Sequence, residues 1–190
     1  ARVLKNIDRL VNKSSTVVAV GEDEFKLLRE SLDPPNLFLV RNLVKKTDWS
    51  LREGMRCYDF AGVGRRSYQK GFDRFIELAR KQPSLSFLWV GAEDDFRVDQ
   101  IQIPPNMVIL EYMPIAEVFA SAKILVCLSR WEGCSTVLTE CIVSSKPFVT
   151  LKCPGAGEFH VPNKNDRIFY EGLSDLSEAA LGLIKSELHE

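Results

Sequence analysis

Short apolar runs alternate with amphipathic stretches along most of this chain. Runs rich in β-branched and aromatic residues predict strands at residues 15–20, 36–40, 55–64, 85–91, 107–112, 123–129, 147–151 and 167–172. Apolar residues at helical spacing predict helices at residues 22–32, 70–81, 115–122, 135–143 and 173–188. Strands that are apolar nearly throughout, and that are separated by helices, are typical of a parallel sheet covered on both faces. We therefore expect an α/β fold with a Rossmann-like, doubly wound parallel sheet flanked by helices.

Two local features modify this pattern. Residues 41–54 are polar, charged and weakly periodic, which is typical of a linker, and the Lys45–Arg52 stretch is the best candidate for a domain boundary. The strand–helix units before the linker look like the last units of a larger domain. In the strand predicted at residues 55–64, Asp59 interrupts the apolar run.

The composition limits the classes of function. With 190 residues and 45% hydrophobic content, the chain can bury a real core. A formal net charge of −1 argues against a protein that binds nucleic acid through bulk charge. With only His160 and His189 available, a histidine-based zinc site is not favoured. We expect neither a metal nor a nucleic-acid partner.

The cysteines and the hydropathy indicate a compartment. The five cysteines contain no CxxC pair, so we interpret them as reduced thiols, which favours a cytoplasmic setting. No apolar run approaches the ~18 residues of a membrane span. Two interpretations stay open for Lys45 and Lys46: solvated linker charges, or a weak contact with the inner membrane surface where an acceptor is lipid-linked.

The most informative segment runs from Ser129 to Gly157 and reads SRWEGCSTVLTECIVSSKPFVTLKCPGAG. A strand, a short polar loop and the beginning of a helix make a natural seat for a phosphate. Glu132 and Glu140 flank this Cys-Ser-Thr turn, and a carboxylate early in the helix could accept hydrogen bonds from sugar hydroxyls. Glu140 could equally be a solvated helix residue. Trp131 either lines a cleft or caps the sheet.

A second segment, AGVGRRSYQKGFD at residues 61–73, follows another predicted strand. Arg65 and Lys70 come just after the strand's carboxyl end, where ligands gather in open α/β sheets. Two cations on one loop can neutralise a diphosphate and stabilise it as it leaves. The alternative is a pair of ordinary surface charges. The Gly62–Gly64 pair by itself is weak support for a dinucleotide site, because Arg65 and Arg66 fit that fingerprint badly.

Together the two segments resemble a known family. VGRRSYQKG looks like the GR…KG loop of the family 4 retaining glycosyltransferases with the GT-B fold, and EGCSTVLTE looks like their E-x7-E motif. The order of the surrounding segments also agrees. The resemblance covers residues 55–188. It implies that residues 45–190 are a nucleotide-sugar donor-binding domain, and that residues 1–44 are the tail of an N-terminal, acceptor-side domain with its hinge.

The resemblance also implies roles. Gly64, Arg65 and Lys70 would hold the donor diphosphate, with Arg65 and Lys70 offsetting charge on the leaving group. Glu140 would accept hydrogen bonds from the ribose.

Around the second motif, Glu132 would face the donor hexose together with the backbone N–H groups of Gly133 and Cys134. Ser135 and Thr136 would place hydroxyl and N–H groups at the diphosphate. Arg65, Lys70 and Glu132 would be the catalytic residues. The reaction would transfer a sugar, with retention, from a nucleoside-diphosphate sugar to an acceptor, without metal or other cofactor.

The acceptor would be a glycan, a lipid carrier or a small molecule, bound through the other domain. We therefore expect this chain to bind a donor without turning it over alone. Two alternatives remain: a non-catalytic nucleotide-binding or regulatory module, and an NAD-binding oxidoreductase domain that would use Glu93. Some positions depart from the family pattern: Ser145 replaces a usual glycine, and Gly155 and Gly157 match a glycine-rich loop only roughly.

Overall fold

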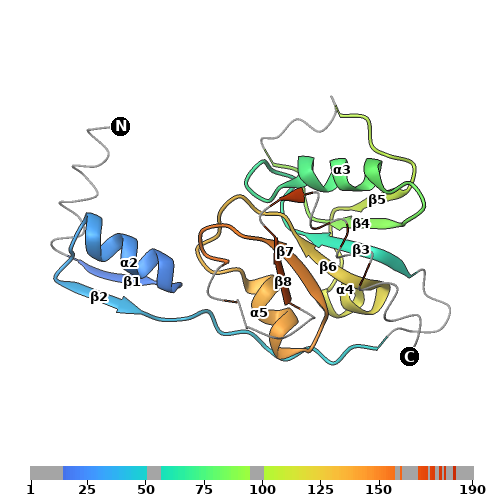
Figure 1. The fold of residues 1–190 in the computed structure, drawn as a ribbon. Helices are drawn as coiled ribbons and strands as arrows, with labels where there is room; N and C mark the ends of the chain where they lie inside the picture. Colours follow the sequence, from blue (N-terminus) through green and yellow to red (C-terminus); the bar gives the residue numbers. More distant parts are fainter. Residues whose placement is uncertain are drawn as a thin grey trace.

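The computed structural model describes residues 15–50, 57–94, 101–156, 159, 167–170, 172–173, 176, 178 and 182. Its main sheet holds six parallel strands in the order β5-β4-β3-β6-β7-β8 (Figure 1). Their bounds are β3 Tyr58–Val63, β4 Phe87–Val90, β5 Met107–Leu110, β6 Ala122–Cys127, β7 Phe148–Leu151 and β8 Arg167–Tyr170. The chain starts at the centre with β3, moves outward to β5, then returns to β6 and moves outward the other way. The reversal leaves a crevice between β3 and β6, where α/β sheets bind ligands.

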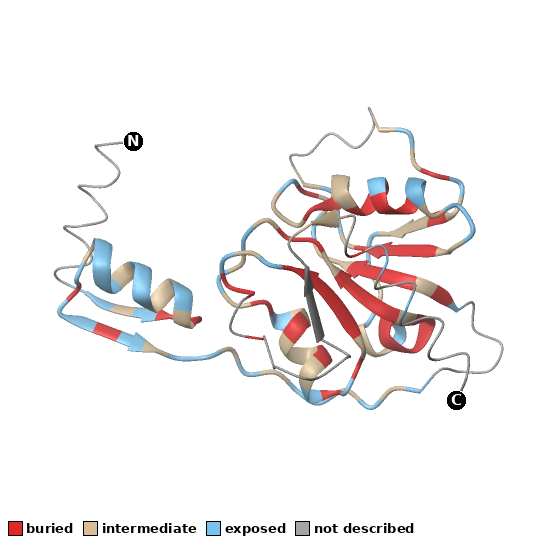
Figure 2. Ribbon diagram, viewed as in Figure 1, coloured by how far each residue is buried: buried red, intermediate tan, exposed pale blue. Residues whose placement is uncertain are grey.

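Helices cover both faces of this sheet, as the apolar strands predicted. Helix α3 (Phe72–Lys81) buries Phe72, Phe75 and Ile76 in a core with Trp89 of β4. Helices α4 (Ile115–Ser121) and α5 (Thr136–Val143) pack on the other face. Figure 2 shows the buried residues concentrated in the strands and on the inner sides of these helices. The predicted doubly wound α/β fold is confirmed.

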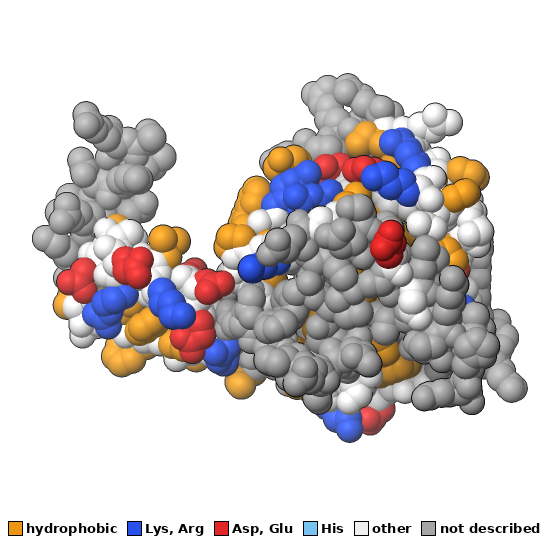
Figure 3. Space-filling view, viewed as in Figure 1, with side chains coloured by type: hydrophobic (Ala, Val, Ile, Leu, Met, Phe, Trp, Pro, Cys, Tyr) orange, Lys and Arg blue, Asp and Glu red, His pale blue; other side chains and the backbone are white. Residues whose placement is uncertain are grey.

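A smaller unit precedes the main sheet. Strands β1 (Thr16–Ala19) and β2 (Asn36–Leu39) pair in parallel and are joined by α2 (Glu22–Ser31). This helix buries none of its residues, and Val18 and Phe38 are about half exposed. Figure 3 shows acidic and basic side chains close together over this unit.

The described part of the linker is extended and lies against the main sheet's domain. The Trp49 indole N–H donates to the carbonyl of Ser144 at 2.8 Å, and the Thr47 amide donates to the Ser144 hydroxyl at 2.9 Å. The buried ammonium of Lys146 lies 3.8 Å from the centre of the Trp49 ring. These contacts anchor the linker, while the division into residues 1–44 and 45–190 stays a prediction.

Several sequence expectations can be compared with the structure. Asp59 does not disrupt β3, because its carboxylate accepts hydrogen bonds from Lys123 and from the amide and hydroxyl of Ser86. Helix α3 begins at Phe72, so Lys70 lies in the loop before it. The predicted beginning of this helix at residue 70 is therefore wrong. The helix expected at residues 173–188 and both histidines lie largely or wholly outside the described residues. Within the described part, no helix has the length and apolarity needed to cross a bilayer.

Candidate functional site

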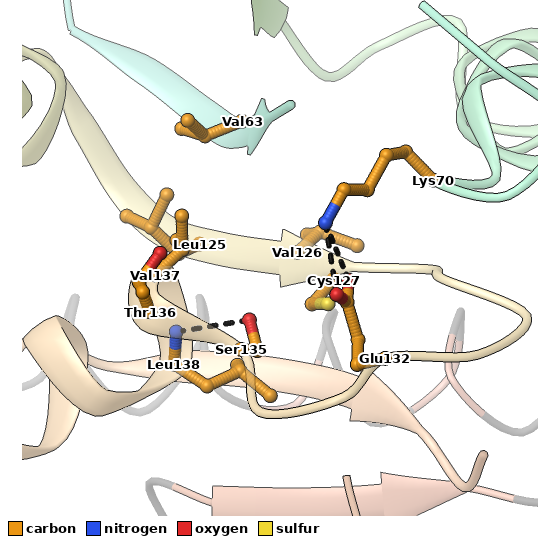
Figure 4. Close-up of a pocket in the computed structure, with 10 residues that line it drawn as sticks. All are labelled: Val63, Lys70, Leu125, Val126, Cys127, Glu132, Ser135, Thr136, Val137 and Leu138. Carbon is orange, nitrogen blue, oxygen red and sulfur yellow. Dashed lines mark hydrogen bonds and ion pairs between the residues drawn. The ribbon is translucent and has the colours of Figure 1, made fainter. Parts of the chain in front are cut away.

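The two segments singled out in the sequence meet at the carboxyl edge of the sheet. The β3–α3 loop and the β6–α5 loop border a cavity of about 30 Å³ (Figure 4). Its lining includes Lys70 from the first loop and Glu132, Ser135 and Thr136 from the second. The chain therefore brings Lys70 and Glu132, 62 residues apart, to one point at the reversal of strand order.

An ion pair between Lys70 and Glu132 occupies this point. The Lys70 Nζ donates to both carboxylate oxygens, at 2.8 and 2.9 Å (Figure 4). The side chains are 24% and 7% exposed, so the pair is much less screened by water than a surface pair. Gly64 leaves room for the lysine stem, because a Cβ there would lie 3.2 Å from Lys70 Cγ.

Further contacts fix the position of Glu132. The Ser129 hydroxyl donates to its Oε1 at 2.5 Å, and the Glu132 amide donates to the carbonyl of Pro154 at 2.9 Å. The next residue, Gly155, has φ of +79°, and a Cβ there would lie 2.0 Å from the Glu132 carbonyl oxygen. Glycine is therefore required at 155, which gives a physical reason for the glycine-rich loop seen only roughly in the sequence.

The beginning of α5 lies against the same cavity. Ser135 is the N-cap, and its buried hydroxyl accepts a hydrogen bond from the Leu138 amide at 3.4 Å. Amide groups in the first turn of a helix have no acceptor within the helix, and the helix dipole makes this end positive. The cavity thus combines an ammonium group, a carboxylate and the positive end of a helix.

Arg65 lies elsewhere on the loop and does not line the cavity. Its guanidinium donates to Asp94 Oδ2 at 2.6 Å and to Gln69 Oε1 at 3.3 Å, and its side chain is 59% exposed. The sequence pattern does not predict the pairing of Asp94 with Arg65. Nothing in the spacing of the two residues indicates the contact, because it depends on β3 and β4 being neighbours.

Glu140 differs from Glu132 in its surroundings. It lies on α5, outside the lining of the cavity, and among the described residues its carboxylate has no hydrogen-bond or ion-pair partner. Partial burial raises the pKa of Glu140 above its ordinary value of 4.5. A partly desolvated carboxylate without a donor can accept hydrogen bonds from a ligand without breaking existing ones.

Cys134, which follows Gly133, and Gly155 connect the site to the smaller unit and to the linker. The Asn42 side chain donates to the Cys134 carbonyl at 3.2 Å, and Asp23 Oδ2 accepts from the Gly155 amide at 3.0 Å. The loop that carries Glu132 therefore lies close to both α2 and the linker.

Ser145, which replaces a usual glycine, has φ of +54°, so this position does adopt the left-handed backbone that favours glycine.

The chain matches one family model over most of its length. The model of glycosyl transferases group 1 matches residues 45–189. The chain belongs to this family. It is also 29% identical, over 119 residues, to an uncharacterised 42.6 kDa protein in the cps region of Klebsiella pneumoniae, and the match covers 60% of this chain and 31% of that protein.

Solved GT-B glycosyltransferases share the fold of this group 1 chain. HepE of Anabaena, solved in complex with UDP, superposes with a TM-score of 0.80 at 15% identity, over 98% of this chain and 59% of that one. A point mutant of S. aureus TarM, solved with fondaparinux, α-GlcNAc-glycerol and UDP, superposes with a TM-score of 0.76 at 18% identity, over 95% and 40%. The chain thus spans less than two thirds of the length of these relatives.

Proposed function

We propose that the crevice between β3 and β6 binds the diphosphate of a nucleoside-diphosphate sugar, and that the chain is the donor side of a family 4 retaining glycosyltransferase. The observation that carries this proposal is the meeting of Lys70, Glu132 and the N-terminus of α5 at one point. Membership of the group 1 glycosyltransferases supports the activity. The presence of UDP in the HepE and TarM complexes supports the donor class.

The Lys70–Glu132 pair lies in the crevice, and the ammonium already donates to both carboxylate oxygens. In this proposal, donor binding opens the pair. The Lys70 ammonium exchanges one carboxylate for phosphate oxygens, and the amide groups at the start of α5 bind the same anion. Arg65, on the same loop as Lys70, exchanges Asp94 for the diphosphate and stabilises the leaving group.

Once released from Lys70, Glu132 faces the sugar. A carboxylate is an acceptor pair for vicinal hydroxyls, so its oxygens take hydrogen bonds from the hexose in place of those from the ammonium. The N–H groups of Gly133 and Cys134 complete this contact. On the other side of the diphosphate, Glu140 accepts hydrogen bonds from the ribose. Transfer then depends on leaving-group stabilisation and positioning, with no metal in the reaction.

The acceptor in this proposal is a glycan, a lipid-linked sugar or a small molecule. The relative in the cps region and the glycan ligands of TarM are consistent with polysaccharide synthesis. A lipid-linked acceptor would bring Lys45 and Lys46 of the linker to a membrane surface on the cytoplasmic side.

Calorimetric titration with UDP, GDP and ADP tests the diphosphate assignment. We expect Lys70→Ala and Arg65→Ala each to weaken binding by about 1.5–3 kcal/mol, the cost of a lost charge-assisted hydrogen bond. Lys81→Ala is the matched control, because Lys81 also pairs with a glutamate but lies at the other end of α3. Parent-like affinity in both site variants would show that the diphosphate binds elsewhere, and tighter binding of NADH than of any diphosphate would favour the oxidoreductase alternative.

A Glu132→Gln variant tests the exchange of partners. Removing the competing carboxylate frees Lys70, so we expect UDP to bind more tightly, by about tenfold for a gain of 1.4 kcal/mol. The same variant should lose the added affinity that the sugar gives to a UDP-sugar. Weaker binding of UDP itself would show that Glu132 does not compete with the anion.

A further inference from the structure

Two exposed aromatic side chains lie on the loop segments that carry Lys70 and Glu132. Tyr68 is 52% exposed and Trp131 is 46% exposed, and their ring centres lie 6.4 Å apart with the planes tilted by 55°. Trp131 directly precedes Glu132, and Tyr68 lies two residues before Lys70. The rings therefore belong to the two loop segments that border the crevice, although neither of them lines the cavity.

Hydrogen bonds between the two loops hold this aromatic pair in place. The Gln69 side chain donates to the Trp131 carbonyl at 3.2 Å, and the Arg130 amide donates to the Gln69 carbonyl at 2.8 Å. The Arg130 guanidinium lies 3.4 Å from the centre of the Tyr68 ring and also donates to the Tyr68 carbonyl at 2.6 Å. Because the backbones and one ring are already ordered, binding of a ligand would lose little further conformational entropy here.

Arg130 is itself fixed by Asp73, to which it donates two hydrogen bonds at 2.8 and 2.7 Å. This pairing holds the pKa of Asp73 below its ordinary value, although burial by itself would raise it. The aromatic pair is thus supported from α3 as well as from both loops. A rigid, half-exposed aromatic surface with charged neighbours suits a ligand that has both apolar faces and hydroxyl groups.

We infer that Tyr68 and Trp131 form a stacking subsite for a pyranose ring of the acceptor. This inference rests on the proposed function, which sets the direction of the donor across the crevice. The ribose lies toward Glu140 on α5 and the transferred sugar toward Glu132. Trp131 directly precedes Glu132 in the chain, so we place the aromatic pair on the sugar side of the diphosphate and not on the nucleobase side. The apolar C–H face of a pyranose packs on such rings while its hydroxyls reach Gln69 and Arg65.

Proton NMR can observe Trp131 separately. Of the three tryptophans, Trp49 and Trp89 donate their indole N–H to the carbonyls of Ser144 and Gly64, whereas Trp131 is the exposed one. The probes are methyl α-D-glucopyranoside, methyl α-D-galactopyranoside and methyl α-D-mannopyranoside. Sorbitol, which has similar hydroxyls but no ring face, is the control ligand.

At least one pyranoside should shift the Trp131 indole signal saturably at millimolar concentrations, without moving the other two, and should do so equally with UDP bound. Saturation transfer to that pyranoside should be lost in Trp131→Ala, largely kept in Trp131→Phe, and unchanged in Tyr112→Ala. Tyr112 is a matched control, since it is 81% exposed and follows the outer strand β5. UDP should bind Trp131→Ala within twofold of the parent.

An unmoved Trp131 signal, or an equal shift with sorbitol, would overturn the subsite. Displacement of the pyranoside by UDP, or loss of UDP affinity in Trp131→Ala, would also overturn it, because the rings would then belong to the nucleotide. Failure of UDP to bind the parent is a separate result: it refutes the diphosphate assignment, while a saturable pyranoside shift would still identify a carbohydrate subsite at these rings.

Discussion

The two glutamates of the E-x7-E motif differ in their hydrogen-bond partners. Glu132 accepts hydrogen bonds from Lys70 and Ser129, and its side chain is 7% exposed. Glu140, on the first turns of α5, has no such partner among the described residues, and burial raises its pKa. One carboxylate is held by the protein itself, whereas the other is partly buried without a compensating hydrogen bond from the part of the chain that the structure describes.

This difference suggests how such a site would work. A carboxylate that already has partners can only exchange them, so Glu132 takes a new partner when an anion binds Lys70 in its place. A carboxylate without partners can only gain them, so binding at Glu140 stabilises a group that folding alone leaves unfavourable. Unfavourable burial of this kind is typical of functional sites.

The largest expected effect comes from removing the Lys70 ammonium group that pairs with Glu132. Lys70→Met leaves the Glu132 carboxylate buried without its ammonium, and we expect the free energy of unfolding to fall by roughly 3 kcal/mol. Chemical denaturation at pH 7 measures the loss. Because the cost lies in the unpaired charge, the double variant Lys70→Met/Glu132→Gln should recover most of it. An equal loss in the single and double variants would mean that Lys70 contributes by packing and not by pairing.

An intermediate effect is expected at the second glutamate. Glu140→Gln should weaken UDP binding by about 2 kcal/mol through lost hydrogen bonds to the ribose, yet should unfold at a higher temperature than the parent in the absence of ligand. Calorimetry and thermal unfolding measure the two changes. Weaker UDP binding together with a higher unfolding temperature would support a ligand-binding role for Glu140. Unchanged UDP binding would show that Glu140 is an ordinary helix residue.

The stability gain of Glu140→Gln should depend on pH with a definite sign. Because the pKa of Glu140 is raised on folding, the folded parent binds the proton more tightly than the unfolded chain. The contribution of Glu140 to the free energy of unfolding therefore falls as the pH rises above 4.5, and this contribution should be absent in the variant. The difference between variant and parent should grow from acid to neutral pH.

The smallest expected effect concerns the support of the β6–α5 loop. Asp73→Asn should reduce the free energy of unfolding by about 1 kcal/mol at neutral pH, as for a partly exposed pair with good geometry. The pKa of Asp73 is lowered on folding, so its contribution is present above 3.8 and is lost as the pH falls further. Denaturation curves of parent and variant should converge at low pH. A constant difference down to low pH would place the effect in packing and not in the Arg130 pair.

Hydrophobic pattern predicted most of the fold. Apolar runs indicated the described strands of the main sheet, and helical spacing indicated α3, α4 and α5, because burial on both faces leaves a clear periodic signal. The boundaries were less accurate at Lys70, which the pattern placed in a helix. The polar interruption at Asp59 gave no hint of its partners Ser86 and Lys123, because these are contributed by other parts of the chain.

The sequence placed both charged loops after strand ends but did not predict how their side chains pair. The structure brings Lys70 and Glu132 from these loops to one cavity, whereas Arg65 and Glu140 lie outside its lining. The Lys70–Glu132 bond, the Arg65–Asp94 bond and the contact of Tyr68 with Trp131 were not expected. Each depends on which strands are neighbours and on side-chain directions at the sheet edge, and a linear motif contains neither.

By itself, the sequence determined the types and order of the elements, the positions of the charged loops and the resemblance to a glycosyltransferase family. These follow from local periodicity and from short motifs, which are properties of neighbouring residues. The tertiary structure decided which charges neutralise one another, which carboxylate is left without a partner among the described residues, and that Trp131 lies exposed beside Tyr68. Those properties arise only when the reversal of strand order brings two distant loops to one crevice, where burial sets the strength of every charge.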